Sequence, residues 1–272
     1  MESGTQTVGI AAAFRTDGAR PKLMPYLMGG FPDLATSLRV GEAYAEAGAD
    51  LVELGVPFSD PLADGPAIQA AGETALRAGA TLERVLEQVA RPLSQRLPVV
   101  LMCYLNPVLH RGLESAIADM AKHGVTGLIV PDLPAREAGD VRAMCDELGV
   151  ALVPLVAPTT PPEEIDWIAS RARGFVYVVS VTGVTGERAE LPAGLGEVVA
   201  RAKAAASVPV AVGFGVATAE QAAEVGKVAD GVIVGSRLVR AIAGAADLDS
   251  GLAEVRDVLG SMAQALRDPG IG

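Results

Sequence analysis

The sequence predicts an α/β protein, a single (β/α)8 TIM barrel. Eight short runs are apolar at nearly every position, a pattern typical of strands buried on both faces of a parallel sheet. An Ala-, Glu- and Arg-rich helical stretch follows each run, so that strands and helices alternate along the chain. The length of 272 residues fits one such barrel. We therefore expect one domain over residues 1–272, with a barrel core at about 22–242.

The expected elements follow from these runs in order. The eight strands are Lys22–Met28, Asp50–Leu54, Pro98–Tyr104, Gly127–Pro131, Val150–Leu155, Phe175–Ser180, Pro209–Gly213 and Gly231–Val234. Apolar side chains at three- and four-residue spacing predict helices at Leu34–Ala47, Ala135–Leu148 and Ala219–Val228. Glycines that precede strands predict helix ends at Gly48, Gly124, Gly149 and Gly174. The alternative, an open doubly wound sheet, normally carries GxGxxG after its first strand, and the sequence lacks that motif there.

Several segments exceed this regular spacing. The stretch from Gly55 to about Pro98 is too long for one loop and one helix, so we expect an extra helical segment after strand two. The Gly- and Thr-rich stretch Val181–Ala193 follows strand six, and a loop of that length is usually a functional lid or disordered. The segments before Lys22 and after Asp247 are expected to form extra helices that cap the barrel ends.

The charge balance excludes several classes of partner. The chain has 22 Lys and Arg residues and 33 Asp and Glu residues, a net charge of −11, so we expect no nucleic-acid or anionic-membrane surface. No apolar run of about 18 residues occurs, and the N-terminus does not resemble a signal peptide, so we expect no membrane span. Two distant cysteines suit a reducing compartment, and we therefore expect a cytoplasmic protein.

Strand two supplies the strongest catalytic candidate. Glu53 lies within the apolar run LVELG, where side-chain alternation directs it into the barrel mouth, the usual place of an active site in such barrels. Burying a carboxylate costs several kcal/mol unless it is paired or neutralised, and that cost raises its pKa toward the range of acid–base catalysts. The alternative is a structural glutamate paired with an arginine.

The loop after strand two carries two more acids. Its sequence, GVPFSDPLADGP, holds Asp60 and Asp64 between prolines that restrict the backbone. A single loop aspartate is most often a solvated turn residue or helix cap. Two aspartates in one rigid loop beside a buried glutamate favour a carboxylate held near a substrate N–H or hydroxyl group.

Glycines at two consecutive strand ends predict an anion site. Strand seven ends in Gly213-Phe214-Gly215, and strand eight ends in Gly235-Ser236 immediately before a helix. Glycine lets a ligand approach the backbone, and the first turn of a helix presents unpaired N–H groups. The loops after strands seven and eight are a recurrent phosphate site of these barrels, although either glycine motif alone could be a tight turn.

The other reactive side chains exclude other chemistries. None of the four lysines ends a strand, which argues against a Schiff-base or pyridoxal-phosphate enzyme. His110, expected in the loop after strand three, and His123, at a helix end, are too few and too far apart for a zinc site, so we expect no metal. Cys103 and Cys145 are expected in the core, and Trp167 between a helix and the barrel. With these chemistries excluded, the reaction class that remains is acid–base catalysis by carboxylates on a phosphorylated small molecule.

Several motifs, taken in order, resemble the α subunits of tryptophan synthases. They are LVELGVPFSDPLADGP at strand two, followed by LMCYLNPV, IVPDLP, YVVSVTGVTGER, VAVGFGV and VIVGS. The resemblance runs from about Phe14 to about Ile242, and the strand-two motif and the GVTG segment are its most specific parts. One departure occurs at Met28-Gly29, where we expect a small polar residue such as Thr; it would change the polarity of the pocket without touching either carboxylate.

The resemblance implies a cofactor-free retro-aldol cleavage of indole-3-glycerol phosphate to indole and D-glyceraldehyde 3-phosphate, the α-subunit reaction of L-tryptophan biosynthesis. The catalytic Glu and Asp of the family correspond to Glu53 and Asp64. Glu53 would deprotonate the C3′ hydroxyl and protonate C3, and Asp64 would accept the ring N–H and stabilise the positive charge. The implied binding residues are Thr185 in the lid, Tyr26, Tyr104 and Tyr177 along the pocket, and the amides of Gly186, Gly213, Phe214, Gly215, Gly235 and Ser236 around the phosphate.

The family also implies a partner. Its members bind a pyridoxal-phosphate β subunit and pass indole to it through a tunnel, so an α2β2 assembly is expected, with Pro57 to Asp60 and the lid around Gly183 facing that subunit. Two alternatives remain open. One is a stand-alone lyase that releases free indole, and the other is a non-catalytic barrel that only activates a β subunit. The presence of Glu53, Asp64 and Thr185 argues against the second.

Overall fold

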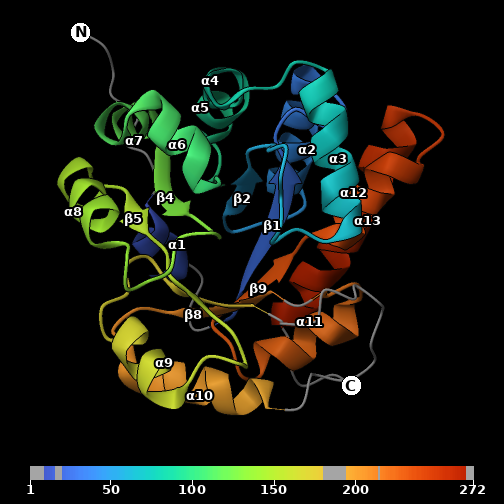
Figure 1. Ribbon diagram of the computed structural model, residues 1–272. Helices are drawn as coiled ribbons and strands as arrows, with labels where there is room; N and C mark the ends of the chain where they lie inside the picture. Colours follow the sequence, from blue (N-terminus) through green and yellow to red (C-terminus); the bar gives the residue numbers. More distant parts are fainter. Residues whose placement is uncertain (1–8, 16–19, 180–193, 214, 268–272) are drawn as a thin grey trace, which may run out of the picture.

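The computed structural model describes residues 9–15, 20–179, 194–213 and 215–267, and in them one parallel sheet curls into a barrel (Figure 1). The strands are β1 (Lys22–Met28), β2 (Val52–Gly55), β3 (Val99–Met102), β4 (Val125–Ile129), β5 (Ala151–Leu152), β6 (Leu155–Val156), β7 (Val176–Val179), β8 (Val210–Gly213) and β9 (Gly231–Val234). All the described strand pairs are parallel. The predicted α/β barrel is confirmed.

The fifth predicted strand, Val150–Leu155, is split into β5 and β6. The sheet order β5-β4-β3-β2-β1-β9-β8-β7-β6 places these two pieces at its ends. Between them, the Val153 N–H donates to the Leu128 carbonyl at 2.9 Å, and the Pro154 carbonyl accepts from the Tyr177 N–H at 3.0 Å. Proline has no N–H to continue the ladder, so Pro154 interrupts the strand. Together β5 and β6 therefore fill one strand position of the barrel, in which β5 pairs with β4 and β6 pairs with β7.

The inside of the barrel is filled in layers. The layer near the N-terminal ends takes one buried side chain from each position: Met24, Leu51, Val100, Ile129, Val153, Phe175, Ala211 and Ile233. Ile10 of α1 (Ile10–Arg15) packs into this layer, so α1 closes this end of the barrel as predicted. Because side chains alternate along a strand, the next inward positions toward the C-terminal ends are those of Tyr26, Glu53 and Tyr177.

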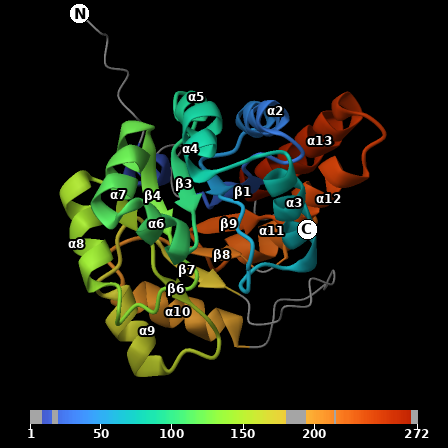
Figure 2. The ribbon, with the colours of Figure 1, turned by 45° about the horizontal axis from the view of Figure 1, so that its top comes forward.

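Helices surround the strands (Figure 2). They are α2 (Leu34–Glu46), α3 (Pro66–Arg77), α4 (Leu82–Val85), the π-helix η1 (Leu86–Ala90), α5 (Arg91–Leu93), α6 (Leu105–Arg111), α7 (Leu113–Lys122), α8 (Gly139–Leu148), α9 (Pro162–Ala169), α10 (Leu195–Ala205), α11 (Ala219–Gly226), α12 (Ser236–Gly244) and α13 (Leu248–Arg267). The elements α3 to α5 are the extra helical segment predicted after strand two. Positive φ angles at Gly48, Gly124 and Gly149 agree with the predicted ends of α2, α7 and α8, whereas α9 ends earlier than predicted, at Ala169 and not at Gly174.

Two predictions about the helical parts were wrong in detail. His110 lies in the last turn of α6 and not in a loop, because Val108 is fully buried and Pro107 fits the first turn of a helix. The C-terminal helix α13 does not cap the barrel end. It packs along α2, α11 and α12 in the outer layer, with buried side chains such as Leu252, Val255 and Leu259 spaced three and four apart.

The structure confirms several of the smaller expectations. Cys103 and Cys145 are buried free thiols, and burial raises the pKa of each to about 12. His123 ends α7, as predicted, and Trp167 of α9 packs half-buried against the core. None of the helices in the described part of the chain is long and apolar enough to cross a bilayer.

Candidate active site

Glu53 lies inside the barrel near its C-terminal end. Strand β2 places it in register between Tyr26 of β1 and Val100 of β3. Its side chain is 3% exposed, and its Oε2 atom has no hydrogen-bond partner among the described residues. No ion pair joins it to an arginine within those residues, so the structural alternative considered for Glu53 has no support there. A buried carboxyl oxygen without a partner is free to serve a ligand.

The surroundings of Glu53 favour its protonated form. Burial raises the pKa of Glu53 to about 8, chiefly by removing water from the charged carboxylate. The negative charge of Asp64 acts in the same direction, and a hydrogen bond from the Tyr177 hydroxyl opposes both. At pH 7 Glu53 is therefore mostly the neutral carboxylic acid, which is held inside the barrel and can donate a proton.

Asp64 approaches the same space from the loop after β2. Its backbone is anchored twice: its N–H donates to the Pro61 carbonyl at 3.1 Å, and its carbonyl accepts from Gln69 Nε2 at 2.9 Å. Partial burial raises the pKa of Asp64 to about 6, and a hydrogen bond from the Tyr104 hydroxyl opposes that increase. Asp64 is thus mostly ionised at pH 7 while Glu53 is mostly protonated. Asp60 differs from both, because it is exposed and bonds to the Ser59 hydroxyl.

Tyr104 fixes this loop in place. Its hydroxyl accepts a hydrogen bond from the Ala63 N–H at 3.0 Å and donates to the Asp64 carboxylate. The Phe58 ring stacks on the Tyr104 ring, with centroids 5.0 Å apart and the planes at 25°. The sequence predicted Tyr104 as a pocket wall, whereas Phe58 was not identified. Its position between Pro57 and Pro61 in the loop was the sequence signal that could have identified Phe58 as part of the site.

Glycines at the strand ends make room for two tyrosine rings. A Cβ atom at Gly55 would lie 2.0 Å from the Tyr26 hydroxyl, and one at Gly213 would lie 2.6 Å from the Tyr177 hydroxyl. Only glycine fits at either position while the rings stay where they are. Gly213, a predicted phosphate-binding residue, therefore shapes the pocket around Tyr177.

The predicted anion site lies on the other side of β1 from β2. Gly235 immediately precedes α12, whose first residue, Ser236, is buried. The first N–H groups of a helix have no partner within it, so this turn presents amides and a positive dipole end. A Cβ atom at Gly235 would lie 3.5 Å from the Cβ atom of Tyr26, and Gly215 is exposed with a φ of +85°. The predicted residues Thr185, Gly186 and Phe214 lie outside the described residues.

The departure at Met28 lies at the edge of this site. Met28 is buried, and its Sδ atom is 3.9 Å from the Tyr26 hydroxyl. Its Cε atom would be 3.4 Å from a Cβ atom at Gly72 of α3. The side chain therefore packs between β1 and α3.

The described residues favour acid–base chemistry. They hold no group of three or more His, Cys, Asp or Glu side chains that could bind a metal ion. They bring together one protonated acid, one carboxylate and three tyrosines, with helix-terminal amides one strand away. Such an arrangement can move a proton at one end of a small molecule and bind an anionic group at the other.

Comparisons with known proteins agree with this description. The family model described as "Tryptophan synthase alpha chain" matches residues 13–267. A tryptophan synthase alpha chain of Roseiflexus sp. (strain RS-1) is 49% identical over 232 residues, which cover 85% of this chain and 89% of the relative. One from Caulobacter vibrioides is 45% identical over 256 residues, 93% of both chains.

Solved structures show the same similarity. A Mycobacterium tuberculosis tryptophan synthase structure has a TM-score of 0.87 and 38% identity, covering 98% of this chain and all of the other. A Legionella pneumophila tryptophan synthase alpha chain has a TM-score of 0.86 and 34% identity, covering 97% of this chain and 98% of the other.

Proposed function

This chain belongs to the tryptophan synthase alpha chain family, a lyase of tryptophan biosynthesis, and we propose that Glu53 and Asp64 carry out its cleavage of indole-3-glycerol phosphate. The single observation that carries the assignment of residues is the unpartnered Oε2 atom of Glu53, an acid with a pKa of about 8 inside the barrel. It is the group best placed to exchange protons with a substrate.

Glu53 acts first as an acid and then as a base. Its carboxyl proton adds to C3 of the indole ring, which converts the ring to a cationic form with a C2=N1 double bond. The carboxylate then takes the proton of the C3′ hydroxyl. As the C3′ carbonyl forms, the C3–C3′ bond breaks and its electron pair restores the ring. Indole and D-glyceraldehyde 3-phosphate result, and Glu53 regains its proton.

Asp64 stabilises the charge that develops between these steps. Its carboxylate, ionised at pH 7, accepts the indole N–H and faces the positive ring while C3 is protonated. A fixed charge that is oriented before the reaction stabilises the charged state more than mobile water does. The hydrogen bond from Tyr104 and the loop contact to Ala63 support this role, because they hold the carboxylate in one position.

The phosphate group binds at the opposite side of the mouth. The amides at Gly235 and Ser236, together with those at Gly213 and Gly215, provide a helix terminus and an open backbone for a dianion. This end requires no lysine or arginine, which fits a chain with a net charge of −11. Thr185, Gly186 and Phe214 complete the proposed lid and phosphate set on the basis of the family resemblance.

A β subunit is the proposed partner, in an α2β2 assembly in the cytoplasm. The solved relatives include structures described as tryptophan synthase from Mycobacterium tuberculosis. The loop after β2 supports this role, because Leu62 is 94% exposed beside the anchored Asp64. Such an apolar tip at the barrel mouth suits contact with another protein.

An indole-release assay with and without a tryptophan synthase β subunit tests the proposal. We expect slow cleavage by the chain alone and a large increase when the β subunit is added. Full activity alone, unchanged by the β subunit, would support the stand-alone lyase. A single-turnover experiment that forms no indole even with the β subunit would support the non-catalytic barrel.

A further inference from the structure

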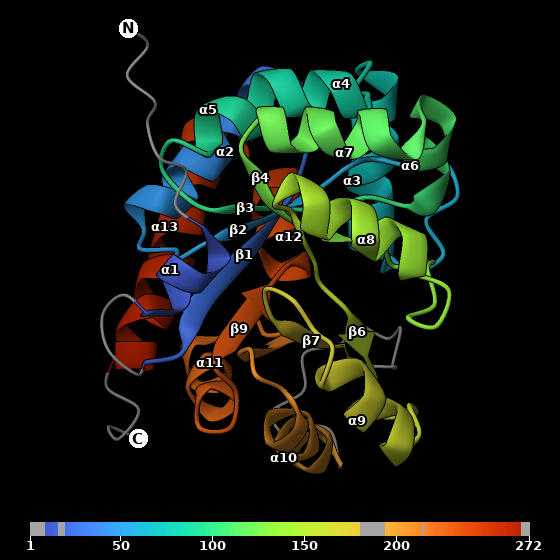
Figure 3. The same cartoon turned by 90° about the vertical axis from the view of Figure 1, so that its left-hand side faces the viewer.

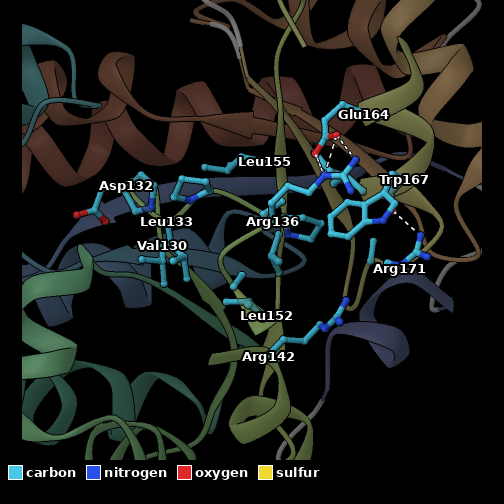
Figure 4. A pocket seen from close by; sticks show the side chains of 18 residues that line it. Val130, Asp132, Leu133, Arg136, Arg142, Leu152, Leu155, Glu164, Trp167 and Arg171 are labelled. Atoms are coloured by element: carbon cyan, nitrogen blue, oxygen red, sulfur yellow. Dashed lines mark hydrogen bonds and ion pairs between the residues drawn. The ribbon is translucent and has the colours of Figure 1, made fainter. Parts of the chain in front are cut away.

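The outer layer of helices has a hollow beside the interrupted strand. Helix α8 packs against α7, and α9 packs against α10. Helices α8 and α9 lie on the same side of the barrel (Figure 3). Residues of both line a pocket of about 490 Å³, within the roughly 300–1,000 Å³ of small-molecule sites (Figure 4). Leu152, Pro154 and Leu155 form part of its wall, so it follows the break between β5 and β6. The residues that line this pocket include neither Glu53 nor Asp64, so the ligand proposed below does not depend on the proposed reaction.

The wall of this pocket is mainly apolar. Leu152 is only half-buried, although it belongs to the outer face of the barrel wall, which helices cover elsewhere. Leu133 adds a second partly exposed apolar side chain, and Ile168 of α9 completes the surface. Apolar area that stays in contact with water favours an apolar ligand.

Three arginines line the same pocket. Arg136 binds the Glu164 carboxylate through Nε at 2.9 and 3.0 Å and stacks on the Trp167 ring at 4.1 Å. Arg171 lies against Trp167 at 4.9 Å and donates to the Trp167 carbonyl at 3.3 Å. Both guanidinium groups are therefore already engaged by the protein.

Arg142 is the exception. Figure 4 shows its guanidinium below the stack of Arg136 and Trp167, on the side of Leu152. Among the described residues no hydrogen bond or ion pair holds this side chain. A half-buried arginine without a partner, beside apolar walls in a chain with a net charge of −11, makes this pocket complementary to a negative group with an apolar tail.

We propose that this pocket binds a small amphipathic carboxylate, such as a medium-chain fatty acid. The carboxylate pairs with the Arg142 guanidinium, whose planar donors match its two oxygens. The alkyl chain lies on Leu152 and Leu133. The edge of the Trp167 ring borders the chain.

Trp167 makes the proposal directly measurable, because it is the only tryptophan in the sequence. Octanoate is titrated into the full-length chain while the tryptophan emission is followed. We expect a saturable change with a dissociation constant below about 1 mM. Octan-1-ol, which keeps the chain but lacks the charge, should bind at least tenfold more weakly. If the tryptophan emission showed no saturable change, the proposal would be overturned, and a macromolecular partner would become the better candidate for this surface. Equal affinity for octanoate and octan-1-ol would overturn the proposal as well.

A matched pair of variants tests the role assigned to the arginine. Arg142→Gln should weaken octanoate binding at least tenfold. Arg91→Gln, at an exposed arginine of α5 outside the pocket, should leave it unchanged. Far-UV circular dichroism checks that both variants fold. Equal affinity in Arg142→Gln and the unmodified chain, or the same loss in both variants, would show that Arg142 does not bind the carboxylate.

Discussion

Glu53 and Asp64 interact electrostatically in the barrel mouth, because the negative charge of Asp64 raises the pKa of Glu53. The two groups reach this space from a buried strand and from the loop that follows it. Their pKa values of about 8 and about 6 leave one acid protonated and the other ionised at pH 7. This division gives each carboxyl group a different role in the proposed reaction.

The first prediction concerns the pH dependence of indole release. Asp64 must be ionised and Glu53 protonated, so kcat/KM should rise through about pH 6 and fall through about pH 8. Because Glu53 and Asp64 interact, the two midpoints describe the pair and not either residue alone. Asp64→Asn removes the negative charge that raises the pKa of Glu53, so its alkaline midpoint should move to lower pH, with a rate lower by about 100-fold. An unchanged alkaline midpoint in that variant would show that the two groups do not interact.

The second prediction separates two roles of Tyr104. If its hydroxyl positions Asp64, Tyr104→Phe should lower kcat by about 10- to 100-fold and change KM little. The acid midpoint should move to higher pH, because the hydrogen bond that lowers the pKa of Asp64 is lost. Tyr44→Phe is the control, since its buried hydroxyl donates to the Tyr26 carbonyl at 3.1 Å and should leave that midpoint in place. A raised KM with an unmoved midpoint would mean that Tyr104 is only a pocket wall.

The third prediction concerns stability. Because the pKa of Glu53 is raised from 4.5 to about 8 on folding, the folded chain binds more protons than the unfolded chain between these values. The free energy of unfolding should therefore fall as the pH rises from about 4.5 to 8, by at most roughly 5 kcal/mol from this group. Glu53→Gln should be more stable than the unmodified chain at pH 8.5 and similar to it at pH 4.5. Urea unfolding at both pH values measures the difference, and parallel curves would contradict the assigned burial.

The fourth prediction concerns the phosphate end. Gly235→Val adds a Cβ atom beside Tyr26 and Ile68, and the two methyl groups on that atom crowd the amides before α12. KM should rise at least tenfold while kcat changes little. Gly260→Ala is the control, because a Cβ atom there meets nothing within 4 Å in α13. Unchanged Michaelis constants in Gly235→Val would argue against this anion site.

Much of the fold was predictable, because a strand buried on both faces is apolar at nearly every position. The same rule failed at Val150–Leu155, where Pro154 interrupts the ladder within an apolar run. It also gave no sign of α6, a short helix held by one buried side chain, Val108. The place of α13 depends on packing against α2 and α11, which are distant in the sequence.

The candidate site was predictable where one residue contrasted with its neighbours. Glu53 was identified because it is the single acid in an apolar run. The prolines of the following loop indicated Asp60 and Asp64 together, and only the family resemblance selected Asp64. The contact of Tyr104 with Ala63 joins residues 41 positions apart, so sequence spacing gave no indication of it. The same holds for the pocket between α8 and α9, which depends on how two helices are spaced.

The most direct test is the activity of Glu53→Gln. We predict that the rate of indole release falls at least about 1,000-fold, whereas the dissociation constant for glycerol 3-phosphate stays within about threefold, because the phosphate end lies across β1 from β2. Glu87→Gln, at an exposed residue of η1, should retain the unmodified rate. Near-normal turnover by Glu53→Gln would contradict the claim that this buried acid transfers the proton.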